Sequence, residues 1–247
     1  MIDGLVNFNL DEVSPTIIKV IGVGGGGGNA VEYMYSKGIC DVDFVVCNTD
    51  AQTLENSPVP LKIQLGKKLT EGHGAGNDPF QGARSAEESL EEIKEMLRRN
   101  TKMAFITAAM GGGTGTGAAP VIARLTKEMD ILTVGIVSIP ARFEGPKRLN
   151  QAREGLRLLK DNVDCLIVID NEKIKKIYGS QTISAAFAKA NDVLNIAAKG
   201  IAEIITLPGY INVDFADVKT VMTNSGVAIM GAAQASGEDR AKRAITE

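Results

Sequence analysis

The chain has 247 residues, of which 44% are hydrophobic and 23% charged, with a formal net charge of −3. These values are typical of a globular protein with one large domain, or one domain and part of a second. The slight acidic excess gives no overall attraction to nucleic acid, and no apolar run reaches the ~18 residues that a membrane-spanning helix needs. We therefore expect neither nucleic-acid binding nor direct membrane insertion.

The cysteine and histidine content argues against two kinds of chemistry. Cys40, Cys47 and Cys165 are scattered without metal-binding spacing, and His73 is the only histidine. An odd number of cysteines and an N-terminus unlike a secretory signal predict reduced thiols and a cytoplasmic protein. We expect no zinc cluster and no His-based catalytic pair, and we expect His73 to be a solvated loop residue.

Alternating apolar runs and helical stretches indicate the fold class. The predicted strands, rich in Val and Ile as in a parallel sheet buried on both faces, cover 17–23, 42–47, 61–65, 103–109, 131–139 and 163–169. The predicted helices cover 84–99, 116–129, 146–161, 182–206 and 215–224. This pattern predicts a doubly wound, mostly parallel, Rossmann-like α/β domain.

The last third of the chain suggests a second unit. The helix at 182–206 is apolar on much of its surface, so we expect it to be buried between two layers. The run 227–236 reads as a further strand without a downstream partner, which would expose an unpaired edge. We expect a main domain at 1–181, a linking helix at 182–207, and the incomplete start of a second α/β domain at 208–247.

Two glycine clusters each follow a predicted strand and precede a predicted helix. VGGGGGNA covers 23–30, and GGGTGTG covers 111–117. Glycine lets backbone N–H groups approach a phosphate, and the start of a helix adds positive potential. A plain tight turn is the simpler alternative, but five consecutive glycines cost more chain entropy than a turn requires.

The presence of two clusters separates two classes of nucleotide-binding protein. A nicotinamide-dependent dehydrogenase would use the first cluster, with Asp50 as the ribose-binding acid, but it would leave the second unexplained. A nucleoside triphosphate would use both, with hydroxyl donors from Thr114 and Thr116. The chain lacks the GxxxxGK[ST] motif, so phosphate recognition would depend on backbone amides and helix ends.

Six motifs in the same order resemble the tubulin/FtsZ family of GTPases along essentially the whole chain. They are KVIGVGGGGGNAV, NTDAQ, GAGNDP, GGGTGTG, RFEGPKR and NVDFADVKTVM. The resemblance implies binding of GTP or GDP with Mg²⁺, with K⁺ as a further candidate ion. It also implies head-to-tail self-assembly at a cytoplasmic midcell ring in bacterial cell division. Division proteins and membrane tethers would bind a C-terminal tail that this sequence does not include.

The resemblance further implies a role for each matching residue. The residues expected to contact phosphate or nucleotide are Gly25, Gly26, Gly27, Gly28, Asn29, Asn48, Gly112, Gly113, Thr114, Gly115 and Thr116. Asp50 and Gln52 would lie at Mg²⁺, and Ala75, Gly76 and Asn77 would sense the γ-phosphate. Glu144 and Arg148 would hold the ribose, and Asn171 would touch the nucleotide. Phe187 and Asn191, which share one helix face, would contact guanine, although core packing is the alternative for Phe187.

No general base is evident within the predicted pocket. Asp214 and Asp217, preceded by Asn212, follow the long helix, where their simplest role is to cap the helix at 215–224. The resemblance implies instead that their loop enters the nucleotide site of the next subunit and positions the attacking water, in an open filament. The alternative is a GTP-binding structural module with negligible hydrolysis. Asp78, near the expected γ-phosphate, would slow turnover.

Overall fold

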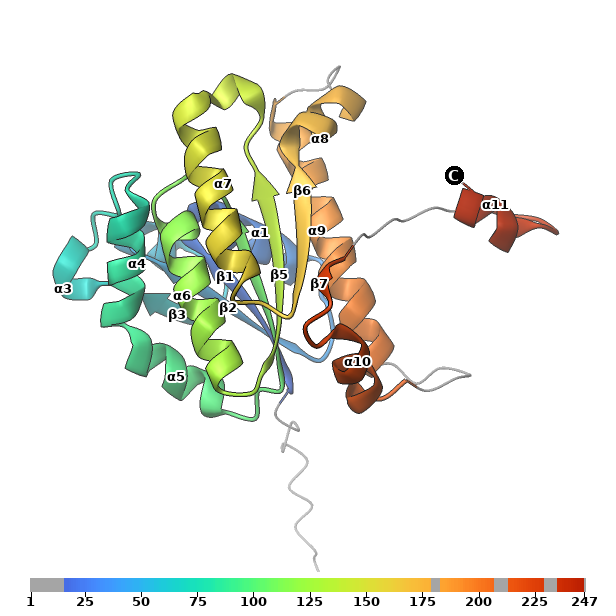
Figure 1. Ribbon diagram of the computed structural model, residues 1–247, viewed down its shortest axis with the longest axis horizontal. Coiled ribbons are helices and arrows are strands. Elements are labelled where there is room, and N and C mark those ends of the chain that lie inside the picture. The colour runs from blue at the N-terminus through green and yellow to red at the C-terminus, as the bar shows by residue number, and fades with distance from the viewer. Residues whose placement is uncertain (1–15, 179–182, 207–212, 229–234, 247) are drawn as a thin grey trace, which may run out of the picture.

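The computed structural model describes residues 16–178, 183–206, 213–228 and 235–246. Within them, seven strands form one sheet in the order β3-β2-β1-β4-β5-β6-β7, and every pairing is parallel (Figure 1). The strands are β1 (Ile18–Val23), β2 (Val42–Asn48), β3 (Leu61–Gln64), β4 (Met103–Ala109), β5 (Leu132–Ile139), β6 (Cys165–Asp170) and β7 (Gly226–Val227). The predicted α/β fold and its six strands are confirmed, with ends that differ by one or two residues.

Helices cover both faces of the sheet and enclose two hydrophobic cores. One core receives side chains from α1 (Gly24–Ser36), α2 (Ala51–Asn56), α8 (Asn171–Tyr178), α9 (Ile183–Thr206) and α10 (Phe215–Met222). The other receives them from α4 (Pro79–Glu88), α5 (Leu90–Arg98), α6 (Thr114–Glu128) and α7 (Pro146–Lys160). Shorter elements are α3 (Lys67–Thr70), the 3₁₀ turn η1 (Arg142–Glu144) and α11 (Arg240–Thr246).

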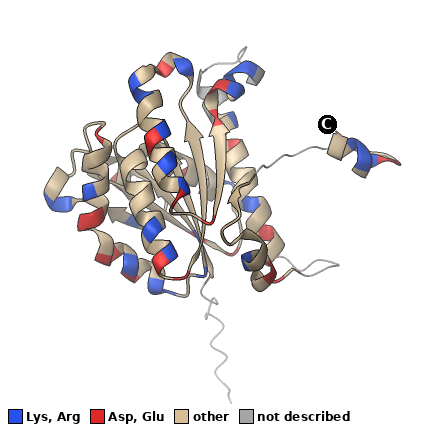
Figure 2. Cartoon of the chain, in the orientation of Figure 1, with Lys and Arg blue, Asp and Glu red and all other residues tan. Residues whose placement is uncertain are grey.

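The central strands β1, β4 and β5 are apolar because both of their faces are buried. In β1, Ile18 and Val20 belong to one core, and Ile21 and Val23 belong to the other. Figure 2 shows charged residues of both signs spread over the helices, whereas the sheet is almost uncharged. No helix in the described part of the chain is long and apolar enough to cross a membrane.

The order of the strands creates a switch point between β1 and β4. These two strands are hydrogen-bonded neighbours, yet α1 leaves β1 on one face of the sheet and α6 leaves β4 on the other. The two connections therefore diverge beyond the carboxyl ends of the strands and leave a crevice between them. Doubly wound sheets bind their ligands in this kind of crevice.

The helix predicted at 84–99 is wrong as a single element, because α4 and α5 are separated at Ser89. The Ser89 hydroxyl accepts a hydrogen bond from the backbone N–H of Gly66 at 3.0 Å, so a contact with a distant loop accompanies the break. The first of the two helices also begins earlier than expected, at Pro79, with Asp78 as its N-cap.

The predicted strand at 227–236 is also wrong in the part that the structure describes. Only Gly226 and Val227 form a strand, and they pair with Cys165 and Leu166 of β6. This segment therefore extends the main sheet, and as the last strand in its order it has a neighbour on one side only among the described residues. Residues 229–234 lie outside the described part of the chain.

The cysteines agree with the expectation of reduced thiols. All three are free, Cys47 and Cys165 are buried, and Cys40 is exposed. Burial raises the pKa of the Cys47 thiol to about 12, with a further contribution from the negative charge of Glu92. Cys47 is therefore a protonated, unreactive core residue.

Candidate functional site

A cavity of about 420 Å³ lies at the switch point, beyond the carboxyl ends of β1 and β4. Its walls come from the start of α1, the end of β4, the start of α6, the end of β5 and the side of α9. Eleven of the predicted site residues line it: Gly25, Gly26, Asn29, Gly112, Gly113, Thr114, Gly115, Glu144, Arg148, Asn171 and Asn191. The sequence motifs therefore converge on one site although they lie far apart in the chain.

The first glycine cluster forms the opening turns of α1. It was expected to precede the helix, but α1 begins at Gly24, whose φ is +72°. A side chain on Gly27 would place its Cβ 2.3 Å from the carbonyl oxygen of Thr107, so this glycine lets the helix approach β4. Gly25 lines the cavity, and a Cβ there would meet no atom within 4 Å. Backbone N–H groups at the start of α1 are thus accessible from the cavity.

The second glycine cluster forms the loop after β4 and the first turn of α6, which begins at Thr114 and not at 116 as predicted. Gly112 resembles Gly25, because it lines the cavity and has open space where a Cβ would lie. Thr116 is buried, and its hydroxyl accepts a hydrogen bond from the N–H of Gly111 at 2.8 Å. That hydroxyl supports the loop and does not line the cavity.

A loop that carries the expected γ-phosphate residues packs against the second cluster. A Cβ on Gly113 would lie 2.8 Å from the Asp78 nitrogen and 3.0 Å from the Ala75 Cβ. Gly76 and Asn77 both have positive φ, and the carbonyl oxygen of Asn77 accepts a hydrogen bond from Gln151 at 3.1 Å. These three expected residues lie next to the cavity wall without lining the cavity itself.

Thr49 connects this region to the end of β2, and sequence reasoning missed it. It is fully buried, and its hydroxyl shares a 2.7 Å hydrogen bond with the hydroxyl of Thr114. Its carbonyl oxygen accepts from the N–H of Gly74 at 3.3 Å, while Asp50 and the exposed His73 form an isolated bridge. Thr49 thereby joins the β2 loop both to the second cluster and to the loop that contains Gly74.

The residues expected near Mg²⁺ offer a limited set of ligands. The Asp50 carboxylate caps α2 by accepting from the N–H of Thr53 at 3.1 Å, and Gln52 is exposed. The buried Asn48 accepts from the N–H of Thr49 at 2.8 Å. In the described part of the chain, no three His, Cys, Asp or Glu side chains gather as a metal site. This donor set fits an ion held by one carboxylate together with substrate phosphates, as Mg²⁺ commonly is.

Another part of the cavity wall, formed by η1 and the starts of α7 and α8, carries an ion pair and an unpaired amide oxygen. Glu144 and Arg148 form an ion pair at 3.0 Å, and Glu144 also accepts from the N–H of Ala141 at 2.9 Å. The Oδ1 atom of Asn171 is buried without a hydrogen-bond partner. A buried, unpaired acceptor is costly, and because Asn171 lines the cavity, this oxygen is available to a donor on a ligand that enters it.

Helix α9 closes the cavity with Ala190, Asn191 and Leu194. Phe187 lies one turn before Asn191 on this helix, but its side chain lies outside the described part of the structure. Several cavity residues were not predicted, because residue types common at strand ends and on buried helix faces give no chemical signal: Val23, Ala108, Ala109, Met110, Ser138, Pro140, Ala190 and Leu194. Gly28 is buried in α1 away from the cavity lining.

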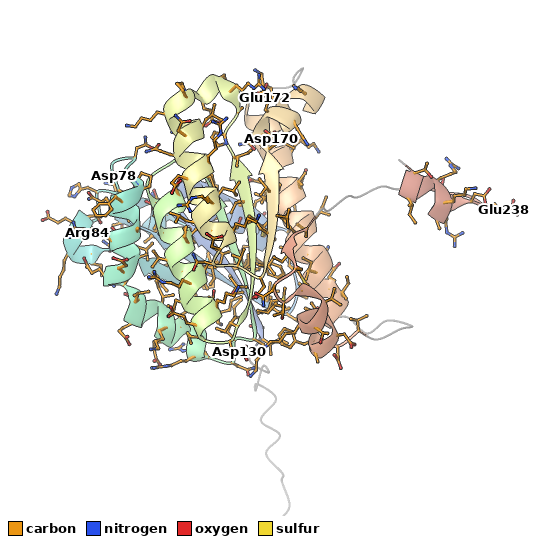
Figure 3. All side chains as sticks on the ribbon, in the orientation of Figure 1. Asp78, Arg84, Asp130, Asp170, Glu172 and Glu238 are labelled. Atoms are coloured by element: carbon orange, nitrogen blue, oxygen red, sulfur yellow. The ribbon has the colours of Figure 1, made fainter. Side chains whose placement is uncertain are left out.

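Asp214 and Asp217 lie at the other end of the domain. Each caps the other at the start of α10: the N–H of Asp217 donates to Asp214 at 2.9 Å, and the N–H of Asp214 donates to Asp217 at 3.3 Å. Lys219 of α10 pairs with Asp130, which precedes β5, at 3.0 Å. Figure 3 shows Asp130 at the end of the molecule opposite Asp170 and Glu172, and Figure 1 places α10 near the Asp130 end. Asn212 lies outside the described residues.

These features define a doubly wound α/β domain with a two-loop cavity at the switch point of its sheet. Residues 17–179 match the model of the Tubulin/FtsZ family GTPase domain. The chain is 51% identical to the cell division protein FtsZ of Porphyromonas gingivalis, over all of this chain and 54% of that protein. The chain therefore belongs to the Tubulin/FtsZ family and spans about half the length of this relative.

Solved structures show the same fold. An empty FtsZ dimer of M. jannaschii superposes with a TM-score of 0.87 at 46% identity, covering 94% of this chain and 67% of that one. A GTPγS-bound protofilament of CetZ2 from Haloferax volcanii superposes with a TM-score of 0.79 at 26% identity, covering 93% and 70%.

Proposed function

We propose that this chain binds GTP and GDP in the two-loop cavity and hydrolyses GTP when it assembles head to tail into cytoskeletal filaments for bacterial cell division. The observation that carries the proposal is the convergence of both glycine clusters on one cavity, where Gly25 and Gly112 leave open space beside exposed helix starts. A volume of about 420 Å³ is within the usual range for small-molecule sites.

The phosphates would lie between the two helix starts. The first turns of α1 and α6 present backbone N–H groups from opposite sides of the crevice, and their dipoles favour negative charge. Thr114 adds a hydroxyl, while Ala75, Gly76 and Asn77 approach the β/γ end. Asp50 and Gln52 would hold Mg²⁺, which would neutralise phosphate charge when bound. Two anion-binding helix starts suit a triphosphate better than the single one that a dinucleotide uses.

The nucleoside would extend toward η1, α8 and α9. Glu144 and Arg148 would hold the ribose, and the unpaired Asn171 Oδ1 would accept a hydrogen bond from the nucleotide. The Asn191 amide would read the edge of the base, and Phe187 would stack on it. The edge of guanine presents N–H donors, and an amide oxygen can accept hydrogen bonds from them.

Hydrolysis would need a second subunit, because the two carboxylates and the cavity lie at opposite ends of the domain (Figure 1). In a head-to-tail contact, Asp214, Asp217 and Asn212 would face the γ-phosphate of the neighbour and position the attacking water. The dimer of the M. jannaschii relative and the GTPγS-bound protofilament of the Haloferax relative support such assembly. We also propose domain limits at 181 and 207, partners bound through a tail, and a cytoplasmic midcell ring.

The decisive experiment measures GTP turnover per subunit against protein concentration for the unmodified chain and Asp217→Asn. Asparagine keeps an oxygen that can accept from the N–H of Asp214, so the cap of α10 is retained while the charge is lost. We expect a rate that rises with concentration and falls by at least about 100-fold in the variant. Glu154→Gln, which changes another exposed carboxylate, is the matched control and should leave the rate unchanged.

Mixing two impaired variants, at a GTP concentration too low to saturate Gly112→Ala, tests whether catalysis occurs between subunits. Asp217→Asn retains its nucleotide cavity, and Gly112→Ala retains its α10 carboxylates. A mixture should recover turnover at the contacts where an intact cavity meets an intact α10. Absence of recovery, with both proteins folded, would contradict catalysis between subunits.

A GTP-binding module with negligible hydrolysis is the second candidate function. The capping contacts of Asp214 and Asp217 favour it, because both carboxylates already have structural partners. A flat, near-zero rate with intact GTP binding would establish this candidate. Binding of NADH in preference to GTP would overturn both.

A further inference from the structure

A charged contact joins α1 to α9. The Tyr33 hydroxyl donates a hydrogen bond to the Asp192 carboxylate, and Lys189 donates to the other oxygen of that carboxylate at 3.3 Å. The Lys37 ammonium lies 5.0 Å from the centre of the Tyr33 ring. These contacts lower the pKa of Asp192, with the Tyr33 hydrogen bond as the largest cause, so the carboxylate is ionised at neutral pH.

Both partners are adjacent to residues that line the cavity. Tyr33 follows Asn29 by four positions, so the two side chains share one face of α1. Asp192 directly follows Asn191 on α9. The contact therefore fixes α9 relative to α1 at the level where Asn191 reaches the cavity.

Small side chains make up most of the buried face of α9. Ala197 is fully buried and Ala198 and Ala202 are each 1% exposed, while Leu194, at 4%, is the one large buried side chain among the described residues of this helix. Alanine side chains form a smooth surface with few projections that could lock one axial position. A directional hydrogen bond to a carboxylate favours one axial position of α9 more strongly than contacts between alanine side chains do.

We infer that Tyr33 and Asp192 are positioning residues that set the axial position of α9 and thereby place the Asn191 amide at the base of the nucleotide. The inference rests on the proposed function, because it assigns the selectivity of the same cavity. Guanine offers an N–H and an amino group to an amide oxygen, whereas hypoxanthine has the N–H alone. A correctly placed Asn191 should therefore bind GDP more tightly than IDP.

The experiment measures dissociation constants for GDP and IDP by calorimetry, together with thermal unfolding, on five forms of the chain. These are the unmodified chain, Tyr33→Phe, Asp192→Ala, Asp192→Asn and Tyr35→Phe. Phenylalanine at position 33 removes one hydroxyl and keeps the ring, while Asn at position 192 keeps an acceptor for that hydroxyl. Tyr35 is the matched control because it lies on the same helix and is 41% exposed.

We expect the preference for GDP over IDP to fall roughly fivefold in Tyr33→Phe and Asp192→Ala, the size of one ordinary hydrogen bond. It should be unchanged in Asp192→Asn and Tyr35→Phe. An unchanged preference in folded Tyr33→Phe would overturn the inference, and so would its loss in Tyr35→Phe. A chain that binds neither nucleotide would refute the proposed function itself. If Asp192→Ala does not fold, the GDP preferences of Tyr33→Phe and Asp192→Asn still test the inference.

Discussion

The two glycine clusters look alike in the sequence, but their glycines serve two different purposes. Gly27 in the first cluster and Gly117 in the second lie against backbone carbonyl oxygens, where a Cβ would be 2.3 Å from Thr107 and 1.9 Å from Pro79. Gly25 and Gly112 instead line the cavity with no atom within 4 Å of a Cβ position. Packing therefore explains the first pair and does not explain the second, which the proposed function assigns to phosphate binding.

The largest expected effect comes from the packed glycines. Gly117→Ala should lower the free energy of unfolding by about 3 kcal/mol, because the backbone of α4 cannot move away easily. Urea denaturation measures this change. Gly28→Ala is the control, since a Cβ there meets nothing within 4 Å and alanine favours a helix by up to ~1 kcal/mol. Equal stability of the two variants would remove the distinction between packed and open glycines.

The threonines of the second cluster should show a smaller contrast. Thr116→Val removes the hydroxyl that accepts from the Gly111 N–H and leaves that buried group unpaired, at a cost of about 1–3 kcal/mol of stability. Thr114→Val leaves the fully buried Thr49 hydroxyl without its partner, so its cost in stability should be similar, and it should also lower GDP affinity, because Thr114 lines the cavity. Chemical denaturation and calorimetry on both variants check that only Thr114→Val changes GDP affinity.

The open glycines should affect binding without affecting the fold. In Gly25→Ala and Gly112→Ala, we expect GDP affinity to fall at least about tenfold, or about 1.4 kcal/mol. The free energy of unfolding should be unchanged or slightly higher. Each new methyl group would occupy space where backbone N–H groups meet the phosphates. Unchanged GDP affinity in both variants would show that the phosphates lie elsewhere.

The smallest expected effect concerns the contact of Tyr33, on the helix α1 that the first cluster begins, with Asp192. The lowered pKa of Asp192 means that its contact with Tyr33 contributes stability above the ordinary carboxyl pKa of about 4, and that this contribution is lost as pH falls through the lowered value. The stability difference between the unmodified chain and Tyr33→Phe should therefore be constant from about pH 5 to 8 and fade below pH 4. Denaturation at stepped pH measures it, and a difference that grew on acidification would contradict this sign.

Sequence patterns predicted the architecture well where burial decides the structure. The apolar runs of β1, β2, β4, β5 and β6 are buried on both faces, so their composition alone identifies them. The break at Ser89 could not be predicted, because its partner Gly66 lies 23 positions away in the sequence. Helices α2, α3 and α8 are short, and they follow strands at points where local periodicity is too brief to detect.

The candidate site was predictable at its chemical residues and not at its walls. The glycines, Asn29, Glu144 and Arg148 have distinctive residue types in recognisable motifs, and the structure brings them to one cavity. Ala108, Met110 and Leu194 contribute ordinary apolar surface that any core contains. Thr49 has no local signal either, because its role depends on Thr114, which lies 65 positions further along the chain.

The reciprocal cap at the start of α10 has a consequence for association. Because Asp214 and Asp217 each accept a hydrogen bond from the backbone of the other, their side-chain rotamers are restricted in the isolated chain. Folding of α10 has then already removed conformational entropy that docking would otherwise have to remove. In the proposed filament, the incoming subunit would meet a preorganised pair of carboxylates, so less of the contact energy would go to ordering and more would remain to hold the subunits together.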